Sequence, residues 1–266
     1  MTDENPTVGG IDVSRPSVAR VYDYWLGGTN HFASDRDMGR RMAELNPALP
    51  QLVRQNRGFI GAAAARAAAA GISQFLDLGS GLPSHPAVHE AVREVNPDAR
   101  VCYVDIDPVA VRHGEVLLDG GEGLAAVQAD LADPEAVLAS PKVGAVIDMA
   151  QPIALILAAV LHFMPAIEGA ALCAQYMRRA APGSWLIVSS GHYQDKELAS
   201  RLQETATHTR LWNHSAADLA SMLAGLAPVA PGVSEASRWI AGTGGEPSGT
   251  PAYPLVAVAV KSVKSG

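Results

Sequence analysis

Asp77, Asp105 and Asp130 each stand at or just beyond the end of a short apolar segment, and Gly79 and Gly81 follow the first of them. Carboxylates in such places accept hydrogen bonds from the hydroxyl and amine groups of a nucleoside, and glycines let a loop turn sharply and approach a ligand closely. A single G-x-G is weak evidence, because many strand-to-helix turns need glycine. Three acidic strand ends in sequence are more specific and predict a nucleoside site.

The roles of the acidic residues can be separated by their neighbours. Asp107 directly precedes Pro108 at the start of an expected helix, so it suits a helix N-cap. That leaves Asp105 for the ribose hydroxyls. Asp130 is placed to accept from an adenine amine while Leu131 covers the ring, although a loop-capping role explains Asp130 equally well.

The glycine loop argues against a dinucleotide. A G-x-G-x-x-G site uses its third glycine for close helix packing, but that position is Ser84, and Pro83 lacks a backbone donor. Asp77 would repel a pyrophosphate but suits an ammonium group. An adenosine ligand with a cationic amino-acid tail and no phosphate is S-adenosylmethionine, which we therefore expect in place of NAD.

Short apolar runs alternate with helical patterns after Gly71, which predicts a doubly wound α/β sheet with parallel strands and right-handed crossovers. The expected strands are 73–78, 100–104, 124–128, 153–161, 184–189 and 253–261. The expected helices between and around them are 85–95, 108–118, 134–138, 167–180, 195–208 and 215–226. Residues 242–250 are expected to form a loop.

The chain is expected to have three parts. Residues 1–16 are expected to be a disordered tail, residues 17–71 an N-terminal helical cap or lid, and residues 72–266 a Rossmann-like cofactor domain. Within the lid we expect helices at 17–26, 35–45 and 50–70. The aromatic-rich segment 22–35 (YDYWLGGTNHFASD) is expected to fold over the ligand edge and exclude water.

The sequence resembles the class I S-adenosylmethionine-dependent methyltransferases, and most closely the actinobacterial S-adenosyl methyltransferase family. The shared stretches span most of residues 16–240 and include PSVARVYDYWLGGTNHFASDR, QNRGFI, FLDLGSGLPSHPAVHEAV, NPDARVCYVDIDPVAV, QADLADPEAVL and PIALILAAVLHFMP. The resemblance implies a seven-stranded sheet whose last strand is antiparallel, and methyl transfer (EC 2.1.1.-). The candidate cofactor-binding residues are Tyr22, Asp77, Gly79, Ser80, Gly81, Asp105, Ile106, Asp130 and Leu131.

The acceptor side is less defined. His162 follows the fourth apolar strand, where a general base would face the acceptor, although a packing role explains it as well. His31 is a second catalytic candidate. Further candidates with structural explanations are Tyr22, Asp23, His192, Trp212, Asn213 and His214. O- or N-methylation of a small molecule is expected, and the alternative is a protein that binds S-adenosylmethionine or its demethylated product without turnover.

Composition limits the other classes. The net charge of −7 and the absence of a Lys/Arg run disfavour a nucleic-acid partner. The N-terminus lacks a signal-peptide pattern and the longest apolar run, 153–161, is too short to span a bilayer, so we expect a cytoplasmic protein without membrane contact. Cys102 and Cys173 show no metal-ligand spacing, so we expect reduced thiols and no metal. The oligomeric state is left open.

Overall fold

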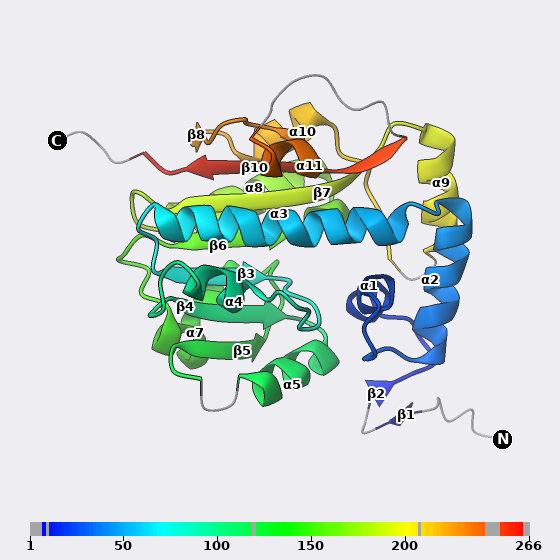
Figure 1. The fold of residues 1–266 in the computed structure, drawn as a ribbon, viewed down its shortest axis with the longest axis horizontal. Coiled ribbons are helices and arrows are strands. Elements are labelled where there is room, and N and C mark those ends of the chain that lie inside the picture. The colour runs from blue at the N-terminus through cyan, green and yellow to red at the C-terminus, as the bar shows by residue number, and fades with distance from the viewer. Residues whose placement is uncertain (1–6, 9–10, 119–120, 207–208, 243–250, 263–266) are drawn as a thin grey trace.

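A computed structural model describes residues 7–8, 11–118, 121–206, 209–242 and 251–262 of the chain. Its centre is a mixed sheet of eight strands (Figure 1). The strands are β3 (Gln74–Leu78), β4 (Arg100–Asp105), β5 (Leu124–Gln128), β6 (Ala154–Ala158), β7 (Trp185–Tyr193), β8 (Ala227–Pro228), β9 (Ser234–Glu235) and β10 (Ala252–Val260).

The strand order is β5-β4-β3-β6-β7-β10-β8, and β9 pairs with β10 beside this path. The five strands β5, β4, β3, β6 and β7 run parallel to one another. Strand β10 is antiparallel to β7, β8 and β9. The predicted doubly wound fold with an antiparallel last strand is therefore confirmed. The two-residue strands β8 and β9 have no apolar pattern, and they raise the strand number above the expected seven.

Helices cover both faces of the sheet, as a parallel sheet requires. One face carries α6 (Pro134–Ala139), α7 (Pro141–Val146), α8 (Ala166–Arg179) and α10 (Ala216–Met222), and the other carries α3 (Leu49–Ala69), α4 (Val88–Arg93) and α11 (Ala236–Ile240). The remaining helices of the sheet region are α5 (Pro108–Leu117) and α9 (Lys196–Thr205). Each face has its own buried apolar cluster, with Tyr176 fully buried in one and Phe59 in the other.

Several elements differ from the sequence prediction; for example, α11 was not predicted, and β7 extends to Tyr193 where the expected strand ended at 189. The strand expected over 153–161 ends at Ala158, because Ala159 takes a left-handed φ of 57° and a 3-10 turn, η1 (Leu161–Phe163), follows. Helix α4 begins at Val88 rather than at 85, since Ala87 is still extended. Helix α7 was not predicted; it starts at Pro141, and the single residue Ser140 separates it from the end of α6.

The N-terminal region contains a two-stranded ladder, β1 (Thr7–Val8) with β2 (Ile11–Asp12), in the segment 1–16 that was expected from the sequence to be a disordered tail. We call α1 (Val18–Leu26), α2 (Ala33–Leu45) and the turn between them the cap. Figure 1 shows the cap beyond the carboxyl ends of β4 and β5. Helix α3, grouped with the lid by sequence, instead lies along the sheet. The expected loop at 242–250 falls almost wholly outside the described residues.

No helix in the described ranges is long and apolar enough to cross a membrane. Cys102 and Cys173 are free and buried, and burial raises the pKa of both thiols to about 12. Neither sulfur is therefore a thiolate at neutral pH.

Candidate functional site

A cavity of about 340 Å³ lies at the carboxyl ends of β3, β4 and β6 and beside the loop after β5. We call it the strand-edge cavity. All nine candidate cofactor-binding residues from the sequence line it: Tyr22, Asp77, Gly79, Ser80, Gly81, Asp105, Ile106, Asp130 and Leu131. Ligands of open α/β sheets bind at this edge, since the loops after parallel strands converge there.

The glycine loop needs its glycines for two different reasons. Gly79 has a φ of 73°, and its N–H donates to the Val104 carbonyl at 2.7 Å. A Cβ there would lie 2.4 Å from a Val160 methyl carbon and 3.0 Å from one of Leu131. Gly81 has a φ of 66° with nothing within 4 Å of a Cβ, so its backbone borders open space.

Gly79→Ala is expected to destabilise the protein by about 2–4 kcal/mol, because a left-handed alanine costs about 1–2 kcal/mol and the clash with Val160 adds about as much again. Gly81→Ala is the control, since it shares the left-handed strain without a clash. Chemical denaturation of both variants measures the difference. Equal losses of stability in the two variants would contradict the packing argument.

Asp77 is buried, with 4% of its surface exposed, and its carboxylate has no hydrogen-bond partner among the described residues. Burial raises the pKa of Asp77 to about 7, an effect that the Arg57 guanidinium opposes and the Asp105 carboxylate reinforces. An unpartnered carboxylate in this position is costly unless a cation joins it. A cationic group placed beside Asp77 would offset this cost.

Asp105 lies at the end of β4 and connects the strand to the glycine loop. Its two carboxylate oxygens accept from the Gly81 N–H at 2.7 Å and from the Asp107 N–H at 2.8 Å. Burial raises the pKa of Asp105 while these N–H groups lower it. The Ile106 N–H is a third backbone donor to this carboxylate, so at least one of its four lone-pair positions stays free for a ligand hydroxyl. Asp107 is the N-cap of α5 and accepts from the Val109 N–H, which confirms the predicted cap.

The loop after β5 forms one wall of the strand-edge cavity. The Asp130 carboxylate accepts from the Ala132 N–H at 2.8 Å, so the loop-capping role exists whether or not a ligand amine is also bound. The Leu131 carbonyl accepts from the Tyr176 hydroxyl at 2.9 Å, which fixes the position of this loop. Ile106 is 65% exposed and also lines this cavity.

Two polar residues of α3 complete the strand-edge cavity and were not named as candidates by sequence. Asn56 donates to the Tyr22 hydroxyl at 2.9 Å, but its Oδ1 is buried without a partner. Arg57 donates through Nη2 to the Ser84 and Pro86 carbonyls, while its Nε is buried and unpartnered. Helix α3 also carries Gln51, Arg54, Gln55 and Arg66, so no signal in the sequence singled out Asn56 and Arg57.

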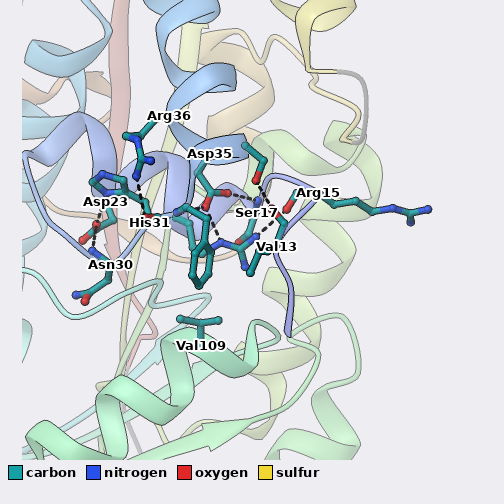
Figure 2. Close-up of polar contacts among 12 residues, drawn as sticks. Val13, Arg15, Ser17, Asp23, Asn30, His31, Asp35, Arg36 and Val109 are labelled. Atoms are coloured by element: carbon teal, nitrogen blue, oxygen red, sulfur yellow. Dashed lines mark hydrogen bonds and ion pairs between the residues drawn. The ribbon is translucent and has the colours of Figure 1, made fainter. Parts of the chain in front are cut away.

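A buried polar network, which we call the clasp, ties the cap to the sheet through Asp107; Figure 2 labels two of its members, Ser17 and Asp35. Arg20 Nε lies 2.8 Å from Asp35 Oδ2 and its Nη1 lies 3.5 Å from Asp107 Oδ2. The Ser17 hydroxyl donates to Asp107, and the Ser17 N–H donates to Asp35 at 2.8 Å. The guanidinium also faces the Phe32 ring, 5.3 Å from its centre. Because Asp107 lies two residues beyond Asp105, the clasp holds the cap next to the strand-edge cavity.

A second cavity of about 150 Å³, the apolar cavity, lies between the cap, η1 and α9. Its walls include Trp25, Met38, Phe163, Leu202 and Trp212. Five residues line both cavities: Ser17, Val18, Tyr22, Ala159 and Phe163. We call these five residues the junction. Ala159 holds its left-handed conformation through hydrogen bonds from its N–H to the Ser189 carbonyl and hydroxyl, so backbone strain is concentrated where the two cavities meet.

The structure separates the two histidines proposed as catalytic. His162, in η1, lines the apolar cavity, and burial together with His214 lowers its pKa to about 4. His31 lies in the turn of the cap, where its Nδ1 is 3.0 Å from Asp23 Oδ2, and it lines neither cavity. Asp23 also accepts from the Asn30 N–H at 2.9 Å, so this pair shapes the turn (Figure 2).

Of the remaining acceptor-side candidates, some line the apolar cavity and others make structural hydrogen bonds. Trp212 and Asn213 line the apolar cavity. His214 is buried, and its Nε2 lies 3.1 Å from the Met164 carbonyl, where it fastens the loop to η1. His192 Nδ1 lies 2.6 Å from the His214 carbonyl. Within the described part of the chain, no three His, Cys, Asp or Glu side chains gather as a metal site.

Comparison with known proteins gives one family. The family model described as S-adenosyl methyltransferase matches residues 4–262. No curated protein matches the chain. A candidate methyltransferase structure from Thermobifida fusca YX is 32% identical, with a TM-score of 0.89 and coverage of 96% of this chain and 98% of that chain. A DUF574 family protein from Streptomyces avermitilis MA-4680 is 30% identical, with a TM-score of 0.86 and coverage of 94% and 99%. Magnesium protoporphyrin IX methyltransferase from Synechocystis PCC 6803, solved with bound SAH, shares the fold at 18% identity, with a TM-score of 0.54 and coverage of 91% and 98%.

Proposed function

Because this chain belongs to the S-adenosyl methyltransferase family, its cofactor is S-adenosylmethionine, and we propose that it methylates an oxygen or nitrogen atom of a small molecule held in the apolar cavity. The observation that carries this proposal is the junction, where the apolar cavity meets the strand-edge cavity at Ala159 and Phe163. Methyl transfer needs two reactants aligned across a short gap with water excluded, which two adjoining cavities provide.

The residues of the strand-edge cavity fit the cofactor in its chemistry. Asp77 offers a carboxylate without a hydrogen-bond partner for the cofactor's ammonium group, and Arg57 offers a buried unpartnered Nε–H for its carboxylate. Asp105 keeps an acceptor position for a ribose hydroxyl. Asp130 and Leu131 would hold the adenine. When bound, S-adenosylmethionine supplies an electrophilic methyl group on a sulfonium centre.

The chain's own contribution to the reaction is alignment and exclusion of water. Tyr22 and Phe163 belong to the junction, and Asn56 and Val53 hold the Tyr22 hydroxyl by hydrogen bonds. Burial raises the pKa of Tyr22, so the phenol stays uncharged at the junction. The clasp keeps the cap in place over the same region. A site closed in this way protects a reactive centre from hydrolysis.

Arg57→Leu is expected to weaken S-adenosylmethionine binding about 10- to 100-fold, the effect of losing a hydrogen bond to a charged group. Arg54→Leu is the matched control, because Arg54 is an exposed arginine on the same helix and lines neither cavity. Calorimetric titration of both variants measures the change. If Arg57→Leu bound the cofactor as tightly as Arg54→Leu, the carboxylate contact would lie elsewhere.

Thermal stabilisation by S-adenosylmethionine, its demethylated product and NAD tests the cofactor, and transfer of labelled methyl groups into small-molecule extracts tests the activity. We expect stabilisation by the first two ligands and labelled product. Stabilisation by NAD alone would contradict the proposal. Tight cofactor binding with no acceptor in any extract would instead favour a non-catalytic sensor.

A further inference from the structure

One hydrogen bond to the His162 ring indicates which of its nitrogens carries the proton. The Gly191 N–H points to His162 Nδ1 at an N···N distance of 3.4 Å. A backbone N–H can only donate, so Nδ1 accepts and the proton of the neutral ring is on Nε2. His162 Nε2 has no hydrogen-bond partner in the described ranges of the chain. The imidazole therefore presents an N–H donor, and it lines the apolar cavity.

The lining of the apolar cavity is uncharged among the described residues. It contains no Asp, Glu, Lys or Arg, and burial raises the pKa of Tyr193 to about 12, so this phenol is neutral as well. The volume of about 150 Å³ matches a cavity that accepts one benzene ring. An ammonium group entering this cavity would find no carboxylate and would face the cofactor's sulfonium charge.

We propose that the methyl acceptor is an apolar molecule of about one ring that carries an oxyanion, such as a carboxylate or an acidic phenol, and that His162 Nε2–H donates a hydrogen bond to its reacting oxygen. This inference rests on the proposed function and deepens it. It narrows the reaction to O-methylation, and it gives His162 a positioning role in place of the general base considered from sequence.

The number of lone pairs favours oxygen over nitrogen. A neutral amine has one lone pair, and an amine that accepts a hydrogen bond from His162 has none left to attack the methyl group. A carboxylate or phenolate oxygen has more than one lone pair, so it can accept from Nε2–H and attack at the same time. A hydrogen bond from His162 Nε2–H can therefore hold an oxygen nucleophile and leave it a lone pair for attack on the methyl group.

The charge balance favours an oxygen that has already lost its proton. His162 carries its proton on Nε2 and its Nδ1 faces the Gly191 N–H, so it has no free site for the acceptor's proton. With an oxyanion, an oxygen lone pair forms the O–CH3 bond while the bond from methyl to the sulfonium sulfur breaks and its electron pair stays on sulfur. No proton moves, and one negative and one positive charge become two neutral products.

Binding tests the acceptor class without turnover. The protein is saturated with sinefungin, an analogue that carries an amine in place of the sulfonium, and titrated with benzoate, 4-nitrophenolate, benzyl alcohol and aniline. We expect at least one of the two anions to bind about tenfold or more tighter than the two neutral ligands. Equal affinities, or no binding of either anion, would overturn the acceptor class. Failure of sinefungin and S-adenosylmethionine to bind would instead overturn the proposed function together with this inference.

The proton position is tested by nitrogen-15 NMR of the histidine rings, with the His162 signals assigned by their loss in His162→Gln. A proton on Nε2 is expected, and a proton on Nδ1 would overturn the donor role. In methyl transfer to the tighter-binding anion, His162→Gln keeps an N–H donor near Nε2 and is expected to stay within about fivefold of the parent, whereas His162→Leu falls about 10- to 100-fold. Equal losses in both variants would overturn the inference.

Discussion

Replacing Asp77 with asparagine is expected to make the cofactor-free protein more stable at pH 8 and, at the same time, to weaken its binding of S-adenosylmethionine. The carboxylate is buried without a hydrogen-bond partner among the described residues, and its pKa is raised to about 7. Ionising it in the folded protein costs free energy that the asparagine variant avoids. If the cofactor's ammonium group binds next to the carboxylate, it offsets this free-energy cost. The asparagine variant lacks the carboxylate, so it should be more stable but bind the cofactor more weakly.

The sign follows from the protons bound in each state. Between pH 4 and pH 7, approximately, the folded protein holds a proton on Asp77 that the unfolded chain has released, so the free energy of unfolding falls as pH rises through this window. Three pH units correspond to at most about 4 kcal/mol. Asp77→Asn should therefore match the parent near pH 4 and exceed its stability by up to this amount at pH 8.

Cofactor affinity should show the opposite trend. In the parent protein, binding releases the Asp77 proton, so the affinity for S-adenosylmethionine rises between pH 6 and pH 8. In Asp77→Asn the affinity should be about 10- to 100-fold weaker at pH 8 and should not rise with pH. Denaturation and calorimetric titration across this range measure both effects. Asp98→Asn, an exposed control, should behave as the parent. A parent affinity independent of pH would contradict the role of Asp77.

Arg20→Leu is expected to release the cap while leaving the sheet folded. Arg20 is 4% exposed and Asp35 is fully buried, so removing the guanidinium leaves the Asp35 charge without its cationic partner. Breaking a buried pair in this way costs about 3–5 kcal/mol. Because Ser17, Val18 and Tyr22 line the strand-edge cavity, opening the cap removes one of its walls, and the apparent affinity falls with the fraction of closed protein.

Hydrogen exchange of the amides of residues 17–35 measures opening of the cap, and calorimetric titration measures the affinity. We expect faster exchange confined to the cap and a weakening of S-adenosylmethionine binding by about tenfold or more. The matched control is Arg15→Leu, whose side chain is 72% exposed, and it should change neither measurement. Faster exchange of the cap with unchanged affinity would show that the cap does not close the cofactor site.

Features that depend on neighbours along the chain could be predicted from the sequence alone. Apolar strands between helices specify a parallel sheet, and such a sheet brings the residues after its strands to one edge, so Asp77, Asp105 and Asp130 were placed together correctly. The N-cap at Asp107 could also be predicted from local sequence, because aspartate is favoured at the N-cap and proline at the first helical position.

The residues from distant segments that join these three carboxylates could not be predicted from the sequence and follow from the tertiary structure. Asn56 and Arg57 reach the strand-edge cavity because α3 crosses the sheet, and no local pattern fixes which turn of a long helix lies over the strand ends. The left-handed Ala159 depends on hydrogen bonds with Ser189, thirty residues away. The proton position that we propose for His162 likewise depends on a hydrogen bond from Gly191 N–H, 29 residues further along the chain. Spacing along a chain encodes which face a residue takes, whereas partners across a fold depend on packing that brings separate segments into contact.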